Sequence, residues 1–326
     1  MYNQSDLKEL IEKALTGLSY NQEAPKLIDP VKYILSIGGK RLRPVMALSA
    51  CNIYTDNITG AVLPAVGIEI FHNFTLVHDD IMDQASVRRG FQTIQNKWNL
   101  NQAVLSGDVM AFIANECFLQ TPNEWLYKVF KVFNKAAIEV CAGQQLDIDY
   151  ENQPIVNQEE YLRMIELKTA VLLAASFKIG SIIGGADDKD SEILYELGRN
   201  LGLAFQIQDD LLDLWGDSKI FGKKPGGDIV ANKKTLPLVK AIEVASGSQL
   251  KQLKELFSQK EGETDEDAKI SQVMTIYNDL KISEIIKETA NSYINNAYSL
   301  LNKIPVAETR KKEMTNLVIS LIDRKF

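Results

Sequence analysis

Two copies of an acidic pattern, Asp-Asp-x-x-Asp, constrain this chain more than any other feature. The two motifs are Asp79, Asp80 and Asp83, and, 130 residues further on, Asp209, Asp210 and Asp213. Both lie in strongly apolar stretches with helical spacing, where burying an unpaired carboxylate costs free energy. Residues four apart share a helix face, so the first and last aspartates of each motif stack and repel each other unless a cation bridges them.

This pattern predicts a cation site lined by carboxylate oxygens, formed where two such helices face each other. Mg²⁺ is the first choice, because it takes few carboxylates and completes its coordination shell with water and phosphate oxygens. The alternative is a pair of solvated acidic faces. It fits less well because each motif is embedded in an otherwise apolar helix.

The composition is that of an ordinary globular protein, with 45% hydrophobic and 24% charged residues. A net charge of −7 disfavours a nucleic-acid-binding protein, which would present a basic surface. The three cysteines, Cys51, Cys117 and Cys141, are odd in number and lie in apolar segments, so buried thiols in a reducing compartment are expected. Without a signal peptide or an uninterrupted run of about 20 apolar residues, a cytoplasmic protein with no membrane span is predicted.

Apolar residues recur with helical spacing along almost the whole chain, and no run alternates as a strand would. The expected helices cover 5–18, 26–37, 43–54, 58–85, 101–120, 124–148, 157–184, 189–216, 234–245, 248–259, 268–280, 282–302 and 306–323. The first of these is expected to begin at a Ser5 cap. No long linker interrupts them, so one all-α domain over residues 1–326 is predicted.

Positive charge is concentrated in short motifs. Lys40, Arg41 and Arg43 follow two glycines, Arg88 and Arg89 follow the first aspartate motif, and the segment Gly222–Asp228 with Lys233 follows the second. A solvated basic turn, or simple neutralisation of the aspartates, would explain each motif taken alone. Together with two Mg²⁺-type acidic motifs, they point to a multiply charged anion, most simply a diphosphate.

Several polar residues stand in apolar surroundings near these motifs. Lys168 and Thr169 lie inside a long apolar helix, and Gln206 lies three residues before Asp209. Without further context, Thr169 and Gln206 are more readily explained as satisfied polar groups of the core. His72 and His78 have no cysteine nearby, so a zinc site is not expected. A P-loop of the form GxxxxGKS/T is absent from the sequence.

With these motifs in this order, the chain resembles the trans-isoprenyl diphosphate synthases, the polyprenyl synthetase family. The matching segments are GGKRLRP (38–44), DDIMD (79–83), RRG (88–90), GD (107–108), GQQLD (143–147), KT (168–169), FQIQDDLLD (205–213) and GKKPGGD (222–228). The resemblance implies the all-α isoprenoid synthase fold, a single large helical bundle around a central apolar cavity. It also implies a homodimer.

The resemblance further implies a role for each matching residue. Asp79, Asp83 and Asp209 would ligate about three Mg²⁺ ions per active site, supported directly or through water by Asp80, Asp210 and Asp213. The allylic diphosphate would be held by Arg88, Lys168, Lys223 and Lys233. The site for isopentenyl diphosphate would comprise Lys40, Arg43, His72 and Arg89, and residues 323–326 resemble a tail that closes over it.

The implied reaction is the head-to-tail (1'-4) condensation of isopentenyl diphosphate with an allylic prenyl diphosphate. The allylic carbon–oxygen bond ionises to a carbocation, which Lys168, Thr169 and Gln206 stabilise by their dipoles. Within the family, an aromatic residue at the position of Phe74 floors the pocket. Phe74 with a small Thr75 resembles the archaeal type of geranylgeranyl synthase, while Phe71 could deepen the pocket or belong to the core.

Geranylgeranyl diphosphate is therefore the expected product, with farnesyl diphosphate as the alternative. A terpene cyclase of the same fold would lack the second aspartate motif and the Lys40, Arg43 and Arg89 site. A non-catalytic regulatory subunit of a heteromeric prenyl synthase would have lost aspartates or diphosphate-binding cations. All of these residues are present, so both alternatives are disfavoured.

Overall fold

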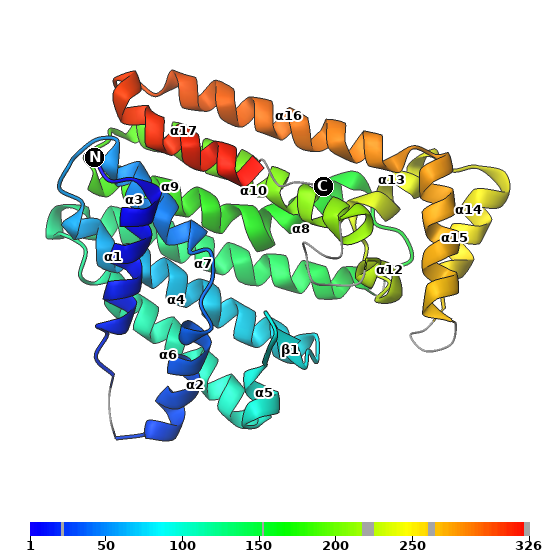
Figure 1. Cartoon of the computed structure of the whole chain (residues 1–326), viewed down its shortest axis with the longest axis horizontal. Coiled ribbons are helices and arrows are strands. Elements are labelled where there is room, and N and C mark those ends of the chain that lie inside the picture. The colour runs from blue at the N-terminus through cyan, green and yellow to red at the C-terminus, as the bar shows by residue number, and fades with distance from the viewer. Residues whose placement is uncertain (21–22, 152, 217–224, 260–264, 323–326) are drawn as a thin grey trace. The chain divides into compact units, whose positions relative to one another are not determined.

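Helices form nearly all of the regular structure in the computed structural model (Figure 1). The structure describes residues 1–326 except 21–22, 152, 217–224, 260–264 and 323–326. The all-α class predicted from the sequence is confirmed. Among the described residues, strand structure is limited to one hairpin with the antiparallel pairs Val87↔Gln92 and Arg88↔Phe91.

The elements follow one another with short connections. The first are α1 (Gln4–Thr16), α2 (Pro25–Ser36), α3 (Leu42–Asn52), α4 (Thr59–Met82), β1 (Val87–Arg88), β2 (Phe91–Gln92), α5 (Ile94–Lys97) and α6 (Leu100–Phe118). The middle ones are α7 (Asn123–Glu151), α8 (Gln158–Ile165), the π-helix η1 (Glu166–Ala170), α9 (Val171–Ile183) and α10 (Asp188–Trp215). The last are α12 (Gly227–Val230), α13 (Leu236–Val244), α14 (Gly247–Leu256), α15 (Glu266–Asp279), α16 (Ile282–Lys303) and α17 (Glu308–Ile322).

The chain divides into two compact units. Unit 1 comprises Met1–Asn134, Ala175–Tyr195 and Ile304–Leu317, and unit 2 comprises Lys135–Ala174, Glu196–Lys303 and Val318–Phe326. The single domain expected over 1–326 stays a prediction.

Unit 1 is organised around α4, which packs against α6, α3 and α1. Most of α4 is apolar on every side, as expected for a helix buried in a core. It is also the one helix among the described residues that is long and apolar enough to cross a membrane, and 61% of its most apolar window is buried inside the protein. That burial, together with the buried Glu69 and Asp80, is typical of a core helix.

Unit 2 has its own apolar core, to which α8, α10, α13, α15 and α16 contribute. The buried residues of α16 recur every three or four positions: Ile282, Ile286, Ala290, Ile294, Ala297 and Leu301. This spacing gives the helix one apolar face, which packs against α13 and α15. Figure 1 shows α15 standing across the beginning of the long α16.

Two expectations from the sequence are corrected. The N-cap of α1 is Asn3 and not Ser5. The Asn3 side chain accepts from the Asp6 N–H while the Asp6 carboxylate accepts from the Asn3 N–H, each at 3.0 Å. Cys51 and Cys117 are buried thiols as predicted, but Cys141 on α7 is exposed.

Candidate active site

The first aspartate motif occupies the C-terminal end of α4 in unit 1. Asp79 is partly buried, Asp80 is 2% exposed, and Asp83 caps the helix end, where its N–H donates to the Asp79 carbonyl at 2.9 Å. The N–H of Ala85 donates to the Asp80 carbonyl at 2.9 Å. The chain therefore turns immediately after the motif and enters the hairpin β1–β2.

The hairpin returns Arg88 to the aspartates. Its Nε lies 2.7 Å from Asp80 Oδ1 and its Nη2 lies 3.5 Å from Asp79 Oδ2. Burial raises the pKa of Asp80, the nearby charges of Asp79 and Asp83 add to this, and Arg88 offsets part of the effect. Arg88 thus offsets the negative charge of the motif, which is one of the two roles that the sequence left open.

Gln95 on α5 holds the turn between the motif and the hairpin. Its Nε2 donates to the carbonyl oxygens of Asp80 at 2.8 Å and Ala85 at 2.9 Å. Thr93 donates its hydroxyl to the same Ala85 carbonyl at 2.8 Å. The end of α4 is therefore fixed by residues more than ten positions away, and the sequence alone gave no sign of this.

The residues expected to bind isopentenyl diphosphate also lie in unit 1. Lys40 is exposed just before α3, and Arg43 on α3 donates from Nη1 to His72 Nε2 on α4 at 3.1 Å. Arginine is always protonated, so this nitrogen of His72 must be an acceptor. Burial and the charges of Arg43, Arg89 and Arg88 lower the pKa of His72 well below its usual value. His72 is therefore neutral beside its cationic neighbours.

Arg89 reaches the loop that carries Lys40. Its Nη1 donates to the Gly38 carbonyl, and a Cβ on Gly39 would lie 2.9 Å from that same Nη1. Gly39 thus allows the guanidinium to pack directly on the backbone. This contact gives Gly39 a structural reason, and it places Arg89 against the loop that carries Lys40; the shared role of Arg89 and Lys40 stays a prediction.

The proposed chain-length residues form part of an aromatic cluster in unit 1. The ring of Phe74 lies 5.3 Å from that of Phe71, which lies 5.2 Å from Phe133. Phe133 in turn stacks on Phe118 at 3.9 Å. Phe71 is 4% exposed, so it is a core residue that supports Phe74 from behind. Thr75 donates its hydroxyl to the His72 carbonyl at 2.8 Å.

Unit 2 carries the second group of predicted residues, and a π-helix shapes it. Lys168 and Thr169 lie in η1, where the N–H of Val171 donates to the Glu166 carbonyl. Such single-turn π-helices are frequent at functional sites. Lys168 Nζ lies 2.5 Å from Asp147 Oδ2, so its charge is paired inside this unit.

The segment GQQLD of α7 accounts for this local geometry. A Cβ on Gly143 would lie 2.2 Å from the backbone nitrogen of Lys168, so only glycine permits this approach. Asp147, one turn further along α7, then pairs with the Lys168 side chain. The sequence marked GQQLD as a motif without a role, and the structure gives it one.

A chain of hydrogen bonds links η1 to the second aspartate motif on α10. The hydroxyl of Thr169 donates to Gln206 Oε1 at 3.1 Å, and Gln206 Nε2 donates to Asp210 Oδ1 at 3.3 Å. Asp210 also accepts from the Tyr161 hydroxyl and, at 3.1 Å, from the Leu236 N–H. Thr169 and Gln206 therefore form part of an ordered polar network that includes the motif.

Asp210 is buried and Asp209 and Asp213 are partly accessible. Burial, together with the charge of Asp228, raises the pKa of Asp210 to about 7, against the hydrogen bonds from Tyr161, Leu236 and Gln206. The Asp228 N–H donates to Asp213 Oδ2 at 3.1 Å. Lys233 lies in the turn after α12, and Lys223 and residues 323–326 lie outside the described residues.

A family model for polyprenyl synthetases matches residues 24–276 of this chain. The chain belongs to the polyprenyl synthetase family. It is 39% identical over 235 residues to the geranylgeranyl diphosphate synthase of Methanosarcina mazei, which covers 72% of each chain. It is 33% identical over 340 residues to the geranylfarnesyl diphosphate synthase of Natronomonas pharaonis, covering 99% of this chain and 97% of that one.

A solved structure of a geranylgeranyl pyrophosphate synthase superposes with a TM-score of 0.95 at 39% identity, covering 100% of both chains. Like its relatives, this polyprenyl synthetase is a prenyltransferase. The family match spans both aspartate motifs, residues 79–83 and 209–213.

The donor sets of this polyprenyl synthetase fit Mg²⁺. Among the described residues, no three His, Cys, Asp or Glu side chains are grouped closely enough to hold a metal ion. Asp80 is paired with Arg88, and Asp210 accepts a hydrogen bond from Tyr161. The accessible carboxylates of each motif suit a cation that uses one or two carboxylates and takes its other ligands from water and phosphate.

Proposed function

We propose that this protein condenses isopentenyl diphosphate with an allylic prenyl diphosphate in a head-to-tail (1'-4) reaction, and that its main product is geranylgeranyl diphosphate. The observation that carries this proposal is the linked network of Thr169, Gln206 and Asp210 in unit 2. It ties the groups expected to stabilise a cation to an aspartate motif expected to hold the leaving group. A polyprenyl synthetase that had lost catalysis would have no need to keep this network.

We assign Asp79, Asp83 and Asp209 as ligands of about three Mg²⁺ ions, with Asp213 as a further accessible carboxylate. Asp80 and Asp210 are better suited to support their neighbours, because both are buried and hydrogen-bonded within the protein. When bound, Mg²⁺ supplies the positive charge that stabilises a departing diphosphate.

The protein's own cations share that task. Arg88 can exchange Asp79 and Asp80 for phosphate oxygens, and Lys168 and Lys233 provide further donors, with Lys223 assigned the same role. As the allylic carbon–oxygen bond breaks, its electron pair leaves with the diphosphate. The Lys168 carbonyl, the Thr169 hydroxyl and the Gln206 amide then offer dipoles to the carbocation without attacking it.

Isopentenyl diphosphate is held by Lys40, Arg43, Arg89 and His72. The double bond of isopentenyl diphosphate attacks the carbocation and forms the new carbon–carbon bond. A proton is then lost to the released diphosphate, which restores a double bond and balances the charge. Water must be excluded during these steps, because it would capture the carbocation.

The product is set by the depth of the apolar cavity, and Phe74 is the proposed floor. Its ring is supported by Phe71 and, behind that, by Phe133, so it cannot move aside cheaply. Similarity to synthases named for geranylgeranyl and geranylfarnesyl products supports a product at least as long as geranylgeranyl diphosphate. Farnesyl diphosphate is the second candidate, since an aromatic floor at Phe74 limits elongation, although the small Thr75 favours the longer product.

We further propose a homodimer that acts in the cytoplasm without spanning a membrane. The dimer is supported by an exposed apolar stripe on α6, formed by Leu105, Phe112 and the adjoining Leu119. The cytoplasmic location is supported by three cysteines that remain free thiols. Its partners are the two small diphosphate substrates, and no nucleic acid is expected.

The proposed function is tested by incubating the purified protein with MgCl₂, isopentenyl diphosphate and one of three starters: dimethylallyl, geranyl or farnesyl diphosphate. Products are sized by mass spectrometry. The expected result is geranylgeranyl diphosphate from each starter. Products that end at farnesyl diphosphate would favour the alternative, whereas folded protein that condenses no starter would point to a regulatory subunit.

A further inference from the structure

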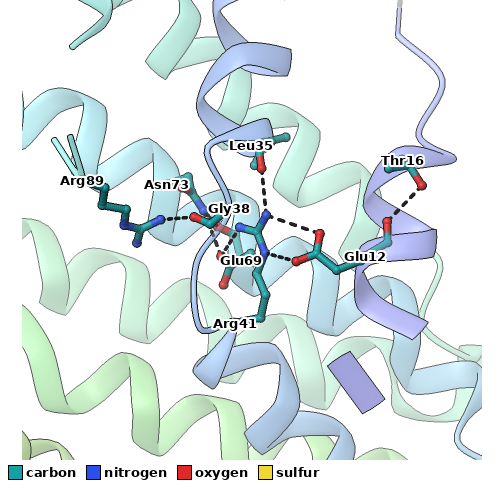
Figure 2. A network of polar contacts seen from close by, with 8 residues as sticks. All are labelled: Glu12, Thr16, Leu35, Gly38, Arg41, Glu69, Asn73 and Arg89. Atoms are coloured by element: carbon teal, nitrogen blue, oxygen red, sulfur yellow. Dashed lines mark hydrogen bonds and ion pairs between the residues drawn. The ribbon is translucent and has the colours of Figure 1, made fainter. Parts of the chain in front are cut away.

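A buried charge network in unit 1 has no part in the reaction described above. The guanidinium of Arg41, 3% exposed, lies between two carboxylates (Figure 2). Its Nε is 2.9 Å from Glu12 Oε1 on α1, and its Nη1 is 2.8 Å from Glu69 Oε1 on α4. Its Nη2 donates to the Leu35 carbonyl in the last turn of α2 at 2.7 Å. One side chain therefore joins α1, α2 and α4 to the start of α3.

The network also fixes the orientation of Glu69. Asn73, one turn along α4, donates from Nδ2 to the Glu69 carbonyl at 2.8 Å and to Glu69 Oε1 at 3.2 Å. Asn73 is fully buried. Figure 2 shows Asn73 and Arg41 meeting at the same carboxylate. Glu69 thus cannot turn away from Arg41 without breaking contacts in a closed interior.

The backbone at Arg41 adopts a conformation that is unfavourable for a non-glycine residue. Its φ is 51°, in the left-handed region that favours glycine. Arg89, whose Nη1 donates to the Gly38 carbonyl of the same loop, also has a left-handed φ of 53°. Non-glycine residues persist in this region only when surrounding contacts hold them there, and such positions gather at ligand-binding sites.

The position of the network relative to the proposed substrate residues gives it a function. Arg41 stands directly after Lys40 and two residues before Arg43. Glu69 precedes His72 by three residues, so the two share a face of α4. Each end of the buried ion pair therefore lies next to residues assigned to isopentenyl diphosphate. Glu12 and Glu69 together carry one more negative charge than Arg41 neutralises. This excess offsets the repulsion among the nearby arginines before the diphosphate binds.

We infer that Arg41 and Glu69, with Glu12, are positioning residues for the isopentenyl diphosphate site. They hold the Gly38–Arg41 loop so that Lys40, Arg43 and Arg89 converge on one diphosphate. This inference rests on the proposed function. It predicts that breaking the network weakens isopentenyl diphosphate binding selectively and leaves allylic substrate binding nearly unchanged.

The test compares Arg41→Met, Glu69→Gln and Glu12→Gln with the wild type. Steady-state KM is measured for each substrate separately, the Kd of isopentenyl diphosphate by calorimetry without an allylic substrate, and Tm by thermal unfolding. Arg310→Met is the matched control. Arg310 ties the other end of α3 by donating to the carbonyls of Asn52 and Ile53 and pairing with Asp56. The Arg310→Met variant therefore also removes hydrogen bonds and an ion pair of an arginine, but at the end of α3 that is far from Lys40.

For Arg41→Met, the KM and Kd for isopentenyl diphosphate are expected to rise about tenfold, because even a small displacement of Lys40, Arg43 and Arg89 weakens their contacts with the diphosphate. Arg41→Lys should recover part of this loss. Arg310→Met should lower Tm without changing either KM. Glu12→Gln changes a side chain that is 41% exposed, and Arg41→Lys keeps the positive charge. These two variants should fold even if Arg41→Met does not, so the inference can still be tested.

Equal changes in KM for both substrates, or a fall in Tm alone, would show that the network only stabilises the fold, and would overturn the inference while the proposed function stands. A wild-type protein that neither condenses the substrates nor binds isopentenyl diphosphate would overturn both together. The two failures are therefore distinguishable.

Discussion

Phe74 is the single residue on which product length is expected to depend. Its ring is partly buried and is braced by Phe71 and by His78, whose ring centroid lies 4.8 Å away. Phe74→Ala should open the floor and lengthen the main product by at least one isoprene unit, as measured by mass spectrometry. Phe130→Ala removes a ring at the edge of the same cluster, 6.2 Å from Phe133, and should leave product length unchanged. Lengthening by Phe71→Ala but not by Phe74→Ala would move the floor to Phe71.

His72 is expected to make the stability of the folded protein depend on pH. Its folded-state pKa lies well below the value of about 6.5 expected in the unfolded chain, so the unfolded state binds more protons as pH falls below that value. The stability contribution of neutral His72 is therefore present above about pH 6.5 and is lost at lower pH, by at most about 1.4 kcal/mol per pH unit. Urea unfolding at pH 7.5 and 5.5 should show a smaller loss for His72→Gln than for the wild type. His78→Gln is the matched control, and equal losses in His72→Gln and wild type would contradict the assignment.

At the scale of elements, α7 and η1 approach each other so closely at Gly143 that the contact leaves no room for a Cβ atom. In Gly143→Ala the new Cβ would meet the backbone of Leu167 and Lys168, which cannot rotate aside. Relief requires η1 to shift, which should lower the free energy of unfolding by about 1–3 kcal/mol or more. The same shift displaces Lys168 and Thr169, so kcat should fall as well. Ala142→Ser, at the exposed neighbouring position, should alter neither quantity. Normal kcat in Gly143→Ala would show that η1 does not position the reacting groups.

The elements also show how far the sequence could lead. Long helices such as α4, α10 and α16 were predicted to within a few residues, because their apolar spacing is a local property. The hairpin β1–β2 was missed because two-residue strands are too short to show alternation. The π-helix was missed because the apolar spacing predicts one continuous helix over 157–184, and the α7 backbone that packs on η1 lies more than twenty residues away in the chain. For the same reason the partners of the site residues, Asp147 for Lys168 and Tyr161 for Asp210, could not be predicted, although both motifs could.

At the scale of the whole molecule, the apolar stripe on α6 argues for association with a second copy. Leu105, Phe112 and Leu119 are 56%, 68% and 52% exposed and recur every seven residues, so they lie along one side of unit 1. Aligned exposed residues of this size are a feature of interfaces, and a twofold dimer would use the same stripe on both copies. Asp108 and Glu116 are exposed beside the stripe, so facing copies would bring like charges together. Salt should therefore strengthen the dimer by screening this repulsion.

Phe112→Asp should convert the dimer to a monomer, because it adds a charge at the centre of an apolar contact, where removing it from water is costly. The molar mass is measured by light scattering during size-exclusion chromatography, at low and high salt. Val244→Asp, which changes another exposed apolar residue (47%) on α13, should leave the mass unchanged. A dimer that survives Phe112→Asp, or one that salt weakens, would place the interface elsewhere. A monomeric wild type would show that the stripe has another purpose. Because Phe112 is exposed on its own unit, the variant should fold, so a loss of mass can be assigned to the interface and not to unfolding.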